Sequence, residues 1–477
     1  MLFSSMVFIF IFLPFICCGY FILKLIAPKK IQLRNVFLLV ASLFFYSWGE
    51  PKNIILMLIS IVANYFFAQF RNKIIFILAI IFNLSFLFFF KYTGFFIQNI
   101  NTLFDLNISI RQFALPIGIS FYTFQALSYV IDVYRKKTEP QKNILNLALY
   151  ISFFPQLIAG PIVRYTDIQN EIQNRTETFD GFISGLKTFM IGLGAKVILA
   201  NNLAIFVDNI YANIENVPVL ILYFVAIAYS LQIYFDFSGY SLMAIGLGKI
   251  FGFNFPENFR HPYCASSVTN FWQRWHITLS TWFRDYVYIP LGGNRVKPVR
   301  HILNIFITWM LTGLWHGASW NFVIWGLYYA VFLIFEKYVV ANIVKRLTSK
   351  TALTIAKVFI RIASLFVIMF GWVIFRLEDA SQLRSVLSRM LFISNASTKV
   401  SFFELEFLLN HASTCSKVMF IIPAIICSVP IYKKLFKNAD KSNIVFSMEL
   451  LFALAIFITS VSFLIASTYN PFIYFRF

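Results

Sequence analysis

Two histidines carry the strongest chemical signal in this chain, and the first of them is His316. It lies in the string LTGLWHGASWNFVIWG, near the middle of an apolar window over 302–335. Polar groups inside a bilayer are costly, about +2.5 to 3.5 kcal/mol for a central Asp on insertion scales, so each one is a candidate for function. A neutral imidazole here could be the general base that activates a hydroxyl nucleophile. It could equally make an interhelical hydrogen bond with a purely structural purpose.

His276 precedes His316 in the string FWQRWHITLSTWFRDYVYIPLGGNR. This segment interleaves tryptophans with basic residues, a mixture typical of short helices that lie at or re-enter the cytoplasmic interface. On spacing alone, a solvated interfacial histidine is the favoured interpretation, because an unperturbed imidazole titrates near neutrality. Arg274 and its basic neighbours fit anionic lipid head groups and the phosphates of a nucleotide-like cofactor equally well.

Two further polar residues fall inside apolar windows. Asp236, in YFDFSGYSLMAIG, is central to the window 218–247 and either lines a polar cavity or pairs with a neighbour. Gln125, in SFYTFQALSYVIDVYR, is a milder signal for which hydrogen bonding between helices is favoured. We predict no metal site, because the sequence has no H-E-x-x-H string and no carboxylate cluster. The absence of a P-loop argues against ATP-driven transport.

The amino-acid composition indicates which kind of fold must position these polar residues. Of the 477 residues, 59% are hydrophobic and 13% are charged, and the mean hydropathy is +0.75, which is far from the balance of a water-soluble domain. A bilayer-spanning helix needs roughly 20 apolar residues, and windows of that kind recur along the chain. The sequence therefore predicts an all-α polytopic membrane protein with about 10 to 12 transmembrane helices. We expect one membrane domain over 1–477, with 254–335 as its catalytic segment.

The net charge of +20 orients the chain. Lysines and arginines sit in short clusters between spans, which indicates the positive-inside bias of membrane proteins and no nucleic-acid partner. Lys24, Lys29, Lys30 and Arg34 follow the first span, and lysines at 433–441 precede the last. Both termini are thus expected outside, which requires an even number of crossings. The polar segment 376–415 opens with LEDASQLRSVLSRML, which predicts an interfacial amphipathic helix.

The chain ends in the aromatic string TYNPFIYFRF. Phe472, Tyr474 and Phe477 form a Phe-x-Tyr-x-x-Phe pattern in this tail, residues 468–477. One interpretation is an aromatic anchor at the outer interface. The other is a terminus that inserts into an outward-facing cavity.

Six strings, in order, resemble the membrane-bound O-acyltransferase superfamily, in its bacterial branch for alginate and peptidoglycan O-acetylation and teichoic acid D-alanylation. They are LPIGISFYTFQALSYVIDVYR, FPQLIAGPIVRY, YFDFSGYSLMAIG, FWQRWHITLSTWFRDYVYIPLGGNR, GLWHGASWNFVIWG and FIYFRF. The resemblance covers most of the chain and implies spanning, re-entrant and interfacial helices around a central funnel or tunnel. A departure is Leu242, where many alginate-type relatives carry an acid; it leaves the chemistry untouched.

The resemblance also implies roles. His316 matches the near-invariant catalytic histidine of the family and His276 the second histidine of the bacterial branch, which replaces the interfacial interpretation of His276. Tyr474 resembles a tail tyrosine that could relay the acyl group. The residues expected to shield the base, line the tunnel or bind substrate are Trp315, Trp320, Asp236, Gln125, Arg274 and Asn321.

The implied reaction takes acetyl from a cytoplasmic thioester, acetyl-CoA, to an extracytoplasmic acceptor across the bacterial inner membrane. No segment of the chain could fold as an extracytoplasmic hydrolase-like domain, so we expect a separate SGNH hydrolase-like partner that completes transfer to the polysaccharide. Membrane lipid is the other expected contact. Two alternatives stay open: D-alanyl transfer to teichoic acid, and a polysaccharide flippase or permease without chemistry.

Overall fold

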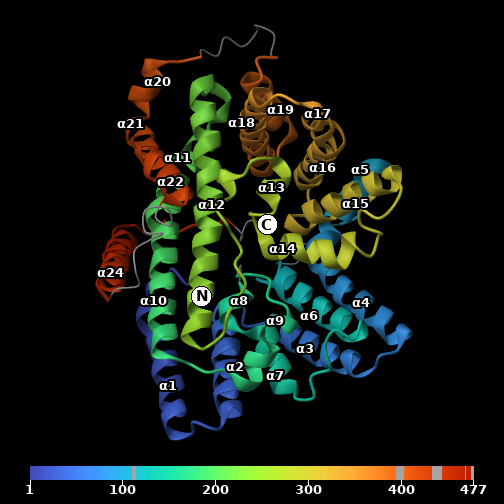
Figure 1. Cartoon of the computed structure of the whole chain (residues 1–477), viewed down its shortest axis with the longest axis vertical. Helices are drawn as coiled ribbons and strands as arrows, with labels where there is room; N and C mark the ends of the chain where they lie inside the picture. The colour runs from blue at the N-terminus through green and yellow to red at the C-terminus, as the bar shows by residue number, and fades with distance from the viewer. Residues whose placement is uncertain (110–113, 159, 394–401, 432–442, 468, 474–477) are drawn as a thin grey trace. The chain divides into compact units, whose positions relative to one another are not determined.

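The computed structural model describes residues 1–109, 114–158, 160–393, 402–431, 443–467 and 469–473. Within these ranges the chain folds into helices joined by turns and loops, with no β-strand, which confirms the all-α class (Figure 1). Contacts divide the chain into two compact units, and the single membrane domain expected from the sequence stays a prediction. The first unit comprises Met1–Leu193, Tyr240–Glu257 and Phe452–Ala466, and the second comprises Gly194–Gly239, Asn258–Leu451 and Ser467–Phe477.

The first unit is built from the N-terminal helices. They are η1 (Phe8–Phe12), α1 (Leu13–Ile26), α2 (Ile31–Ser47), α3 (Ile54–Gln69), α4 (Lys73–Leu87), η2 (Phe88–Tyr92), α5 (Thr93–Phe104), α6 (Ile119–Tyr134), α7 (Ile144–Ser152), α8 (Phe154–Leu157), α9 (Tyr165–Asn174) and α10 (Phe179–Gly194).

The second unit follows α10. Its helices are η3 (Ala195–Ala200), α11 (Asn201–Ala212), η4 (Ile214–Asn216), η5 (Pro262–Cys264), α13 (Val268–Trp272), α14 (Ile277–Phe283), η6 (Arg284–Tyr288), α15 (Pro298–His316), α16 (Trp320–Phe335), η7 (Glu336–Val340), α17 (Ala341–Arg346), α18 (Lys350–Arg376), α19 (Ala380–Met390), α20 (Leu405–Asn410), α21 (Ala412–Cys415), η8 (Ser416–Phe420) and α22 (Ile421–Ser428). The unit boundary falls inside α12 (Val219–Ile250) and α24 (Asn443–Ala466), and it also separates Gly194 from the rest of α10.

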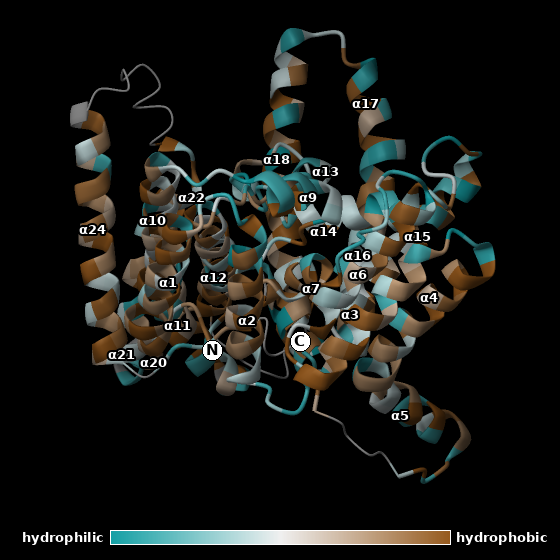
Figure 2. Ribbon diagram, turned by 90° about the horizontal axis from the view of Figure 1, so that it is seen from below, coloured by the Kyte–Doolittle hydropathy of each residue, from teal (hydrophilic) through white to brown (hydrophobic). Residues whose placement is uncertain are grey.

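Seven helices of the described chain are long and apolar enough to cross a membrane. They run over Phe8–Ile26, Lys73–Phe104, Phe179–Ala212, Val219–Ile250, Trp320–Arg346, Lys350–Arg376 and Val445–Ala466, with shorter apolar helices at Ile31–Ser47, Ile54–Gln69 and Ala412–Ser428. The span within α24 shows why lipid is required: its mean hydropathy is 2.3, yet only 11% of it is buried. Figure 2 shows brown along most of α4 and α24 and teal on α17. Apolar side chains exposed along a helix need hydrocarbon around them.

The apolar window 302–335 is two helices rather than one. α15 ends at His316, and α16 begins at Trp320. Gly317 permits the break, because a Cβ there would lie 2.1 Å from the Phe322 ring. His316 consequently occupies a helix end and not the middle of a span. The helix expected from LEDASQLRSVLSRML is present as α19, begun by Asp379, whose side chain accepts a 2.8 Å hydrogen bond from the Gln382 N–H.

Glycines bring α15 and α16 close together as antiparallel neighbours. A Cβ on Gly313 would lie 2.2 Å from the Phe322 carbonyl oxygen, and one on Gly326 would lie 2.3 Å from the Trp309 carbonyl oxygen. Small residues at helix contacts allow this approach in membrane proteins. The pair of helices therefore holds His316 at a fixed position.

Gly326→Ala is expected to destabilise the protein by about 1–3 kcal/mol, because the added methyl group overpacks a backbone contact. The measurement is the apparent unfolding temperature of purified protein in detergent. The control is Gly49→Ala, where the new Cβ meets its nearest neighbour at an ordinary 3.5 Å. Equal unfolding temperatures for the two variants would contradict the close packing of α15 on α16.

Candidate active site

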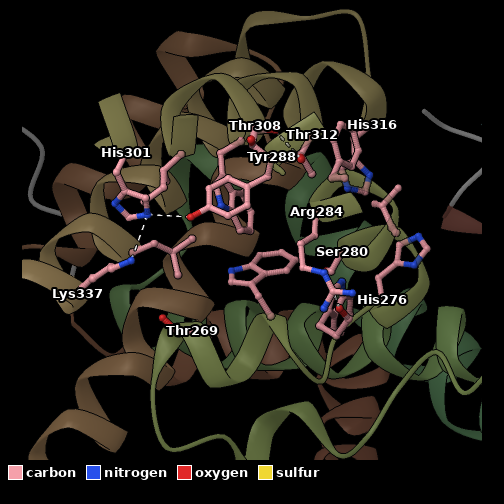
Figure 3. A pocket seen from close by; sticks show the side chains of 17 residues that line it. Thr269, His276, Ser280, Arg284, Tyr288, His301, Thr308, Thr312, His316 and Lys337 are labelled. Atoms are coloured by element: carbon pink, nitrogen blue, oxygen red, sulfur yellow. Dashed lines mark hydrogen bonds between the residues drawn. The ribbon is translucent and has the colours of Figure 1, made fainter. Parts of the chain in front are cut away.

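A cavity of about 280 Å³ lies within the second unit. Its wall is formed by α13, α14, η6, α15, α16 and η7, and it contains both candidate histidines, His276 and His316 (Figure 3). Trp272 and Trp309 are among the apolar residues that line it. Two residues that the sequence separates by 40 positions therefore share one chamber.

His316 is the last residue of α15 and is 5% exposed. Three aromatic rings meet it edge-on, with centroid distances of 5.0 Å to Trp315, 5.1 Å to Trp325 and 5.3 Å to Phe375. The partial negative charge at the C-terminal end of a helix interacts favourably with a cation. It therefore favours the imidazolium that forms when this histidine accepts a proton.

A polar stripe leads along α15 to His316. Asn304, Thr308 and Thr312 precede it at intervals of four residues, which places all four side chains on one helix face. The Thr308 and Thr312 hydroxyls donate to the carbonyl oxygens of Asn304 and Thr308, at 2.7 and 2.8 Å. Thr308, Thr312 and His316 line the cavity, so this face gives the chamber a polar wall.

His276 is the N-cap residue of α14 and is 1% exposed. Its Nδ1 lies 3.1 Å from the side-chain oxygen of Asn258. Its ring packs at 4.6 Å from Phe237 and 6.0 Å from Trp315, so Trp315 contacts both imidazoles. Burial, with a smaller contribution from nearby His316, holds the pKa of His276 well below its usual range. His276 is therefore neutral at pH 7.

The other end of the cavity is basic, as Figure 3 shows. His301 Nε2 lies 2.8 Å from the Tyr288 hydroxyl and 3.2 Å from Lys337 Nζ. Among the described residues, no carboxylate pairs with Lys337. Arg284 also lines the wall and donates to Asp285 at 2.8 Å. This end has the charge and the donors to hold an anion.

Asp236 does not line the cavity. It forms a buried ion pair with Lys196 at 2.6 Å and accepts a 2.8 Å hydrogen bond from the main-chain N–H of Ile473. Lys196 in turn donates to the Pro471 carbonyl oxygen and, at 2.7 Å, to Asn201. Asp236 and Lys196 thus fix the tail's main chain. Tyr474, the next residue after Ile473, lies outside the described residues.

The remaining predicted residues are not part of the cavity lining. Trp320 is 58% exposed, and Trp325 and Phe375 pack on His316 together with Trp315. Asn321 donates to the Phe375 carbonyl oxygen at 3.3 Å.

Arg274 and Gln125 do not line the cavity either. Arg274 donates to Asn270 at 3.0 Å and to the Arg260 carbonyl oxygen at 3.4 Å. Gln125 belongs to the first unit, on α6.

Three residues that the sequence analysis missed organise the site: Asn258, Lys196 and Trp325. Lys196 had a signal, since it stands in the apolar string FMIGLGAKVILA, where a charge is costly. Trp325 falls within the string GLWHGASWNFVIWG, although nothing local distinguishes it from Trp320. Asn258 lies in a polar loop and carries no such mark.

The two buried imidazoles, His276 and His316, can take part in acid–base chemistry. The basic end of the same cavity, with Lys337 and His301, can hold an anion. Among the residues that the structure describes, no group of three His, Cys, Asp or Glu side chains could hold a metal ion. A neutral imidazole in a mostly apolar chamber can take a proton from a hydroxyl and return it to a leaving group. That pattern suits the transfer of an acyl group.

Comparison with known proteins agrees with this chemistry. The model of the MBOAT, membrane-bound O-acyltransferase family, matches residues 141–378. The chain is 42% identical over 394 residues to the probable alginate O-acetylase AlgI of Pseudomonas syringae pv. tomato, covering 80% of this chain and 73% of that protein. It is 35% identical over 432 residues to the peptidoglycan O-acetyltransferase of Helicobacter pylori, covering 83% and 81%. It is 32% identical over 237 residues to the teichoic acid D-alanyltransferase of Bacillus subtilis, covering 46% of this chain and 60% of that protein.

Proposed function

Because this chain belongs to the membrane-bound O-acyltransferase family and is an acyltransferase, we propose that it passes an acetyl group from a cytoplasmic thioester donor to an extracytoplasmic acceptor or partner. The product is an O-acetylated cell-wall or exported polysaccharide. The observation that carries this proposal is the shared cavity, in which His316 and His276 are both buried and both contact Trp315.

His316 is the general base of the proposed reaction. It takes the proton of the incoming hydroxyl while the hydroxyl oxygen attacks the thioester carbonyl carbon. The tetrahedral intermediate then collapses, the carbon–sulfur bond breaks, and the imidazolium returns its proton to the departing thiolate. The helix end at His316 favours the transient imidazolium, and the surrounding rings of Trp325 and Phe375 exclude water.

The donor enters at the basic end of the cavity. Acetyl-CoA carries phosphates at one end and the thioester at the other, so an elongated site needs cations at one end and a base at the other. Lys337 supplies the charge at that end, and Trp272 and Trp309 are among the apolar residues that line the cavity. Lys337 is the stronger candidate for a phosphate contact, because Arg284 already has a carboxylate partner in Asp285.

The C-terminal tail receives the acyl group on the acceptor side. Ile473 is held through its main chain by Asp236, and Phe472 is buried. Tyr474 follows directly, so its hydroxyl is our candidate for the acyl relay. In this scheme the tyrosine ester passes its acetyl group to a separate SGNH hydrolase-like partner, which esterifies the glycan. The protein then acts at the inner membrane with both termini outside the cytoplasm.

Mass spectrometry of cell-wall and exported glycans tests the function directly. Deleting the gene is expected to leave the polymer at its normal abundance without its acetyl ester, and re-expression of the chain restores the ester. Loss of D-alanine esters with acetyl esters intact would identify the chain as a D-alanyltransferase. Loss of the polymer itself would indicate a flippase or permease.

Reconstitution tests the partner. In liposomes supplied with acetyl-CoA, the chain alone is expected to leave an added polysaccharide unmodified and to acetylate it once the partner protein is included. Acetylation of the polymer by the chain alone would show that no partner is needed.

A further inference from the structure

Asn258 holds the segment around His276 with both its main chain and its side chain. Its carbonyl oxygen accepts a 3.0 Å hydrogen bond from the N–H of Ile277. Its side-chain Oδ1 accepts from the Thr278 N–H at 3.3 Å and from the Thr278 hydroxyl at 2.9 Å, and lies 3.1 Å from His276 Nδ1. Asn258 is 1% exposed, so water does not compete for these contacts.

The backbone N–H of Thr278 decides which atoms of Asn258 and His276 face each other. An amide side chain has an oxygen and a nitrogen end that look alike, but only the oxygen can accept from a backbone N–H. The atom of Asn258 that contacts Thr278 is therefore the oxygen. Because the same oxygen faces Nδ1 of His276, Nδ1 must carry the hydrogen. In a neutral ring the second nitrogen, Nε2, then has the lone pair.

His276 also has an unusual backbone. Its φ is 42° and its ψ is 55°, a left-handed conformation that is costly for residues other than glycine. Such conformations persist where the surroundings fix them, and they concentrate at functional sites. Here the hydrogen bonds from Ile277 and Thr278 to Asn258 secure the turn at His276.

From these contacts we infer that Asn258 is a positioning residue, which holds His276 as its Nδ1–H tautomer so that Nε2 meets the substrate as a hydrogen-bond acceptor. This inference rests on the proposed function, because its effect on rate is defined for acetyl transfer. It gives the two histidines different roles. A neutral His276 in this tautomer accepts a hydrogen bond from the donor or from the attacking hydroxyl, and it does not donate a hydrogen bond to the oxyanion of the intermediate.

Three variants test the inference in acetyl-transfer assays across a range of pH. Asn258→Leu removes the acceptor behind Nδ1 at nearly constant size. It is expected to lower kcat on the order of 10–100-fold, the range seen when the partner behind a metal-ligating imidazole is lost. Asn258→Asp keeps an acceptor and adds a negative charge beside His276, which stabilises the imidazolium. The acidic limb of its pH–rate profile is expected to move to higher pH by about 1 unit or more.

Thr278→Val is the matched control, because it removes one hydrogen bond to the same oxygen and leaves the backbone N–H in place. It is expected to change kcat by less than about threefold, with an unmoved pH profile. The other titratable groups of the cavity, His316, His301, Arg284, Tyr288 and Lys337, are unchanged in all three variants. An Asn258→Asp protein whose acidic limb stays in place would overturn the inference. This variant also decides the matter if Asn258→Leu fails to accumulate.

A spectroscopic measurement separates this inference from the proposed function. Protein labelled with ¹⁵N and ¹³C at its histidines, in lipid vesicles, reports the ring N–H of His276, assigned by difference from His276→Gln. The ring N–H is expected to correlate with Cγ, the ring carbon that is bonded to Nδ1 and not to Nε2, in the parent and to lose this preference in Asn258→Leu. A ring N–H at Nε2 in the parent would refute the inference, whether or not the chain transfers acetyl groups.

Discussion

His316→Ala is expected to lower the rate of acetyl transfer on the order of 10²–10⁴-fold, the usual loss when a general base is removed. The residue lies at a helix end and lines the cavity. Its imidazole is packed against three aromatic rings, so the alanine variant has no imidazole at this place to accept the proton. The measurement is the amount of ester on the glycan, or acetyl transfer by purified protein, at equal amounts of protein in the membrane.

His411→Ala serves as the control for this prediction. His411 lies between α20 and α21, where its Nδ1 approaches the Phe407 carbonyl oxygen at 3.0 Å, and it does not line the cavity. This variant is expected to keep the parent rate. A His316→Ala protein that accumulates normally and still acetylates fully would remove His316 from the mechanism.

Lys196→Met is expected to destabilise the protein by about 3–5 kcal/mol, because it leaves the carboxylate of Asp236 buried without its cation. Lys196 and Asp236 are 1% and 2% exposed, and their atoms lie 2.6 Å apart. The measurement is the apparent unfolding temperature in detergent. Lys417→Met is the control. Lys417 is half-buried, donates a 3.3 Å hydrogen bond to Asn202, lies 5.7 Å from the centre of the Phe420 ring and has no buried carboxylate partner among the described residues, so the expected cost is about 1 kcal/mol.

The double variant Lys196→Met with Asp236→Leu separates stability from function. Replacing both partners of a buried pair with apolar residues often restores stability. The tail, however, loses the acceptor for the Ile473 N–H and the donor to the Pro471 carbonyl oxygen. We therefore expect a stable protein with strongly reduced acetyl transfer. Parent-level transfer in the double variant would show that the anchored tail has no part in the reaction.

The sequence by itself determined the helical membrane fold and the family. These follow from local properties, since each spanning helix satisfies its own backbone hydrogen bonds and is recognised from one continuous apolar run. The family followed from six strings read in order, and its relatives confirm it. The interfacial placement of α19 and the outward termini stay predictions.

Only the tertiary structure decided which side chains meet. Trp320 and Trp325 are five residues apart on α16, about 140° around the helix, so one is exposed and the other packs on His316. Asp236 finds its partners 40 residues earlier, at Lys196, and 237 later, at Ile473. His276 is set by Asn258, 18 residues before it. Such contacts depend on how helices and loops are rotated and packed against one another, which no local pattern in the sequence specifies.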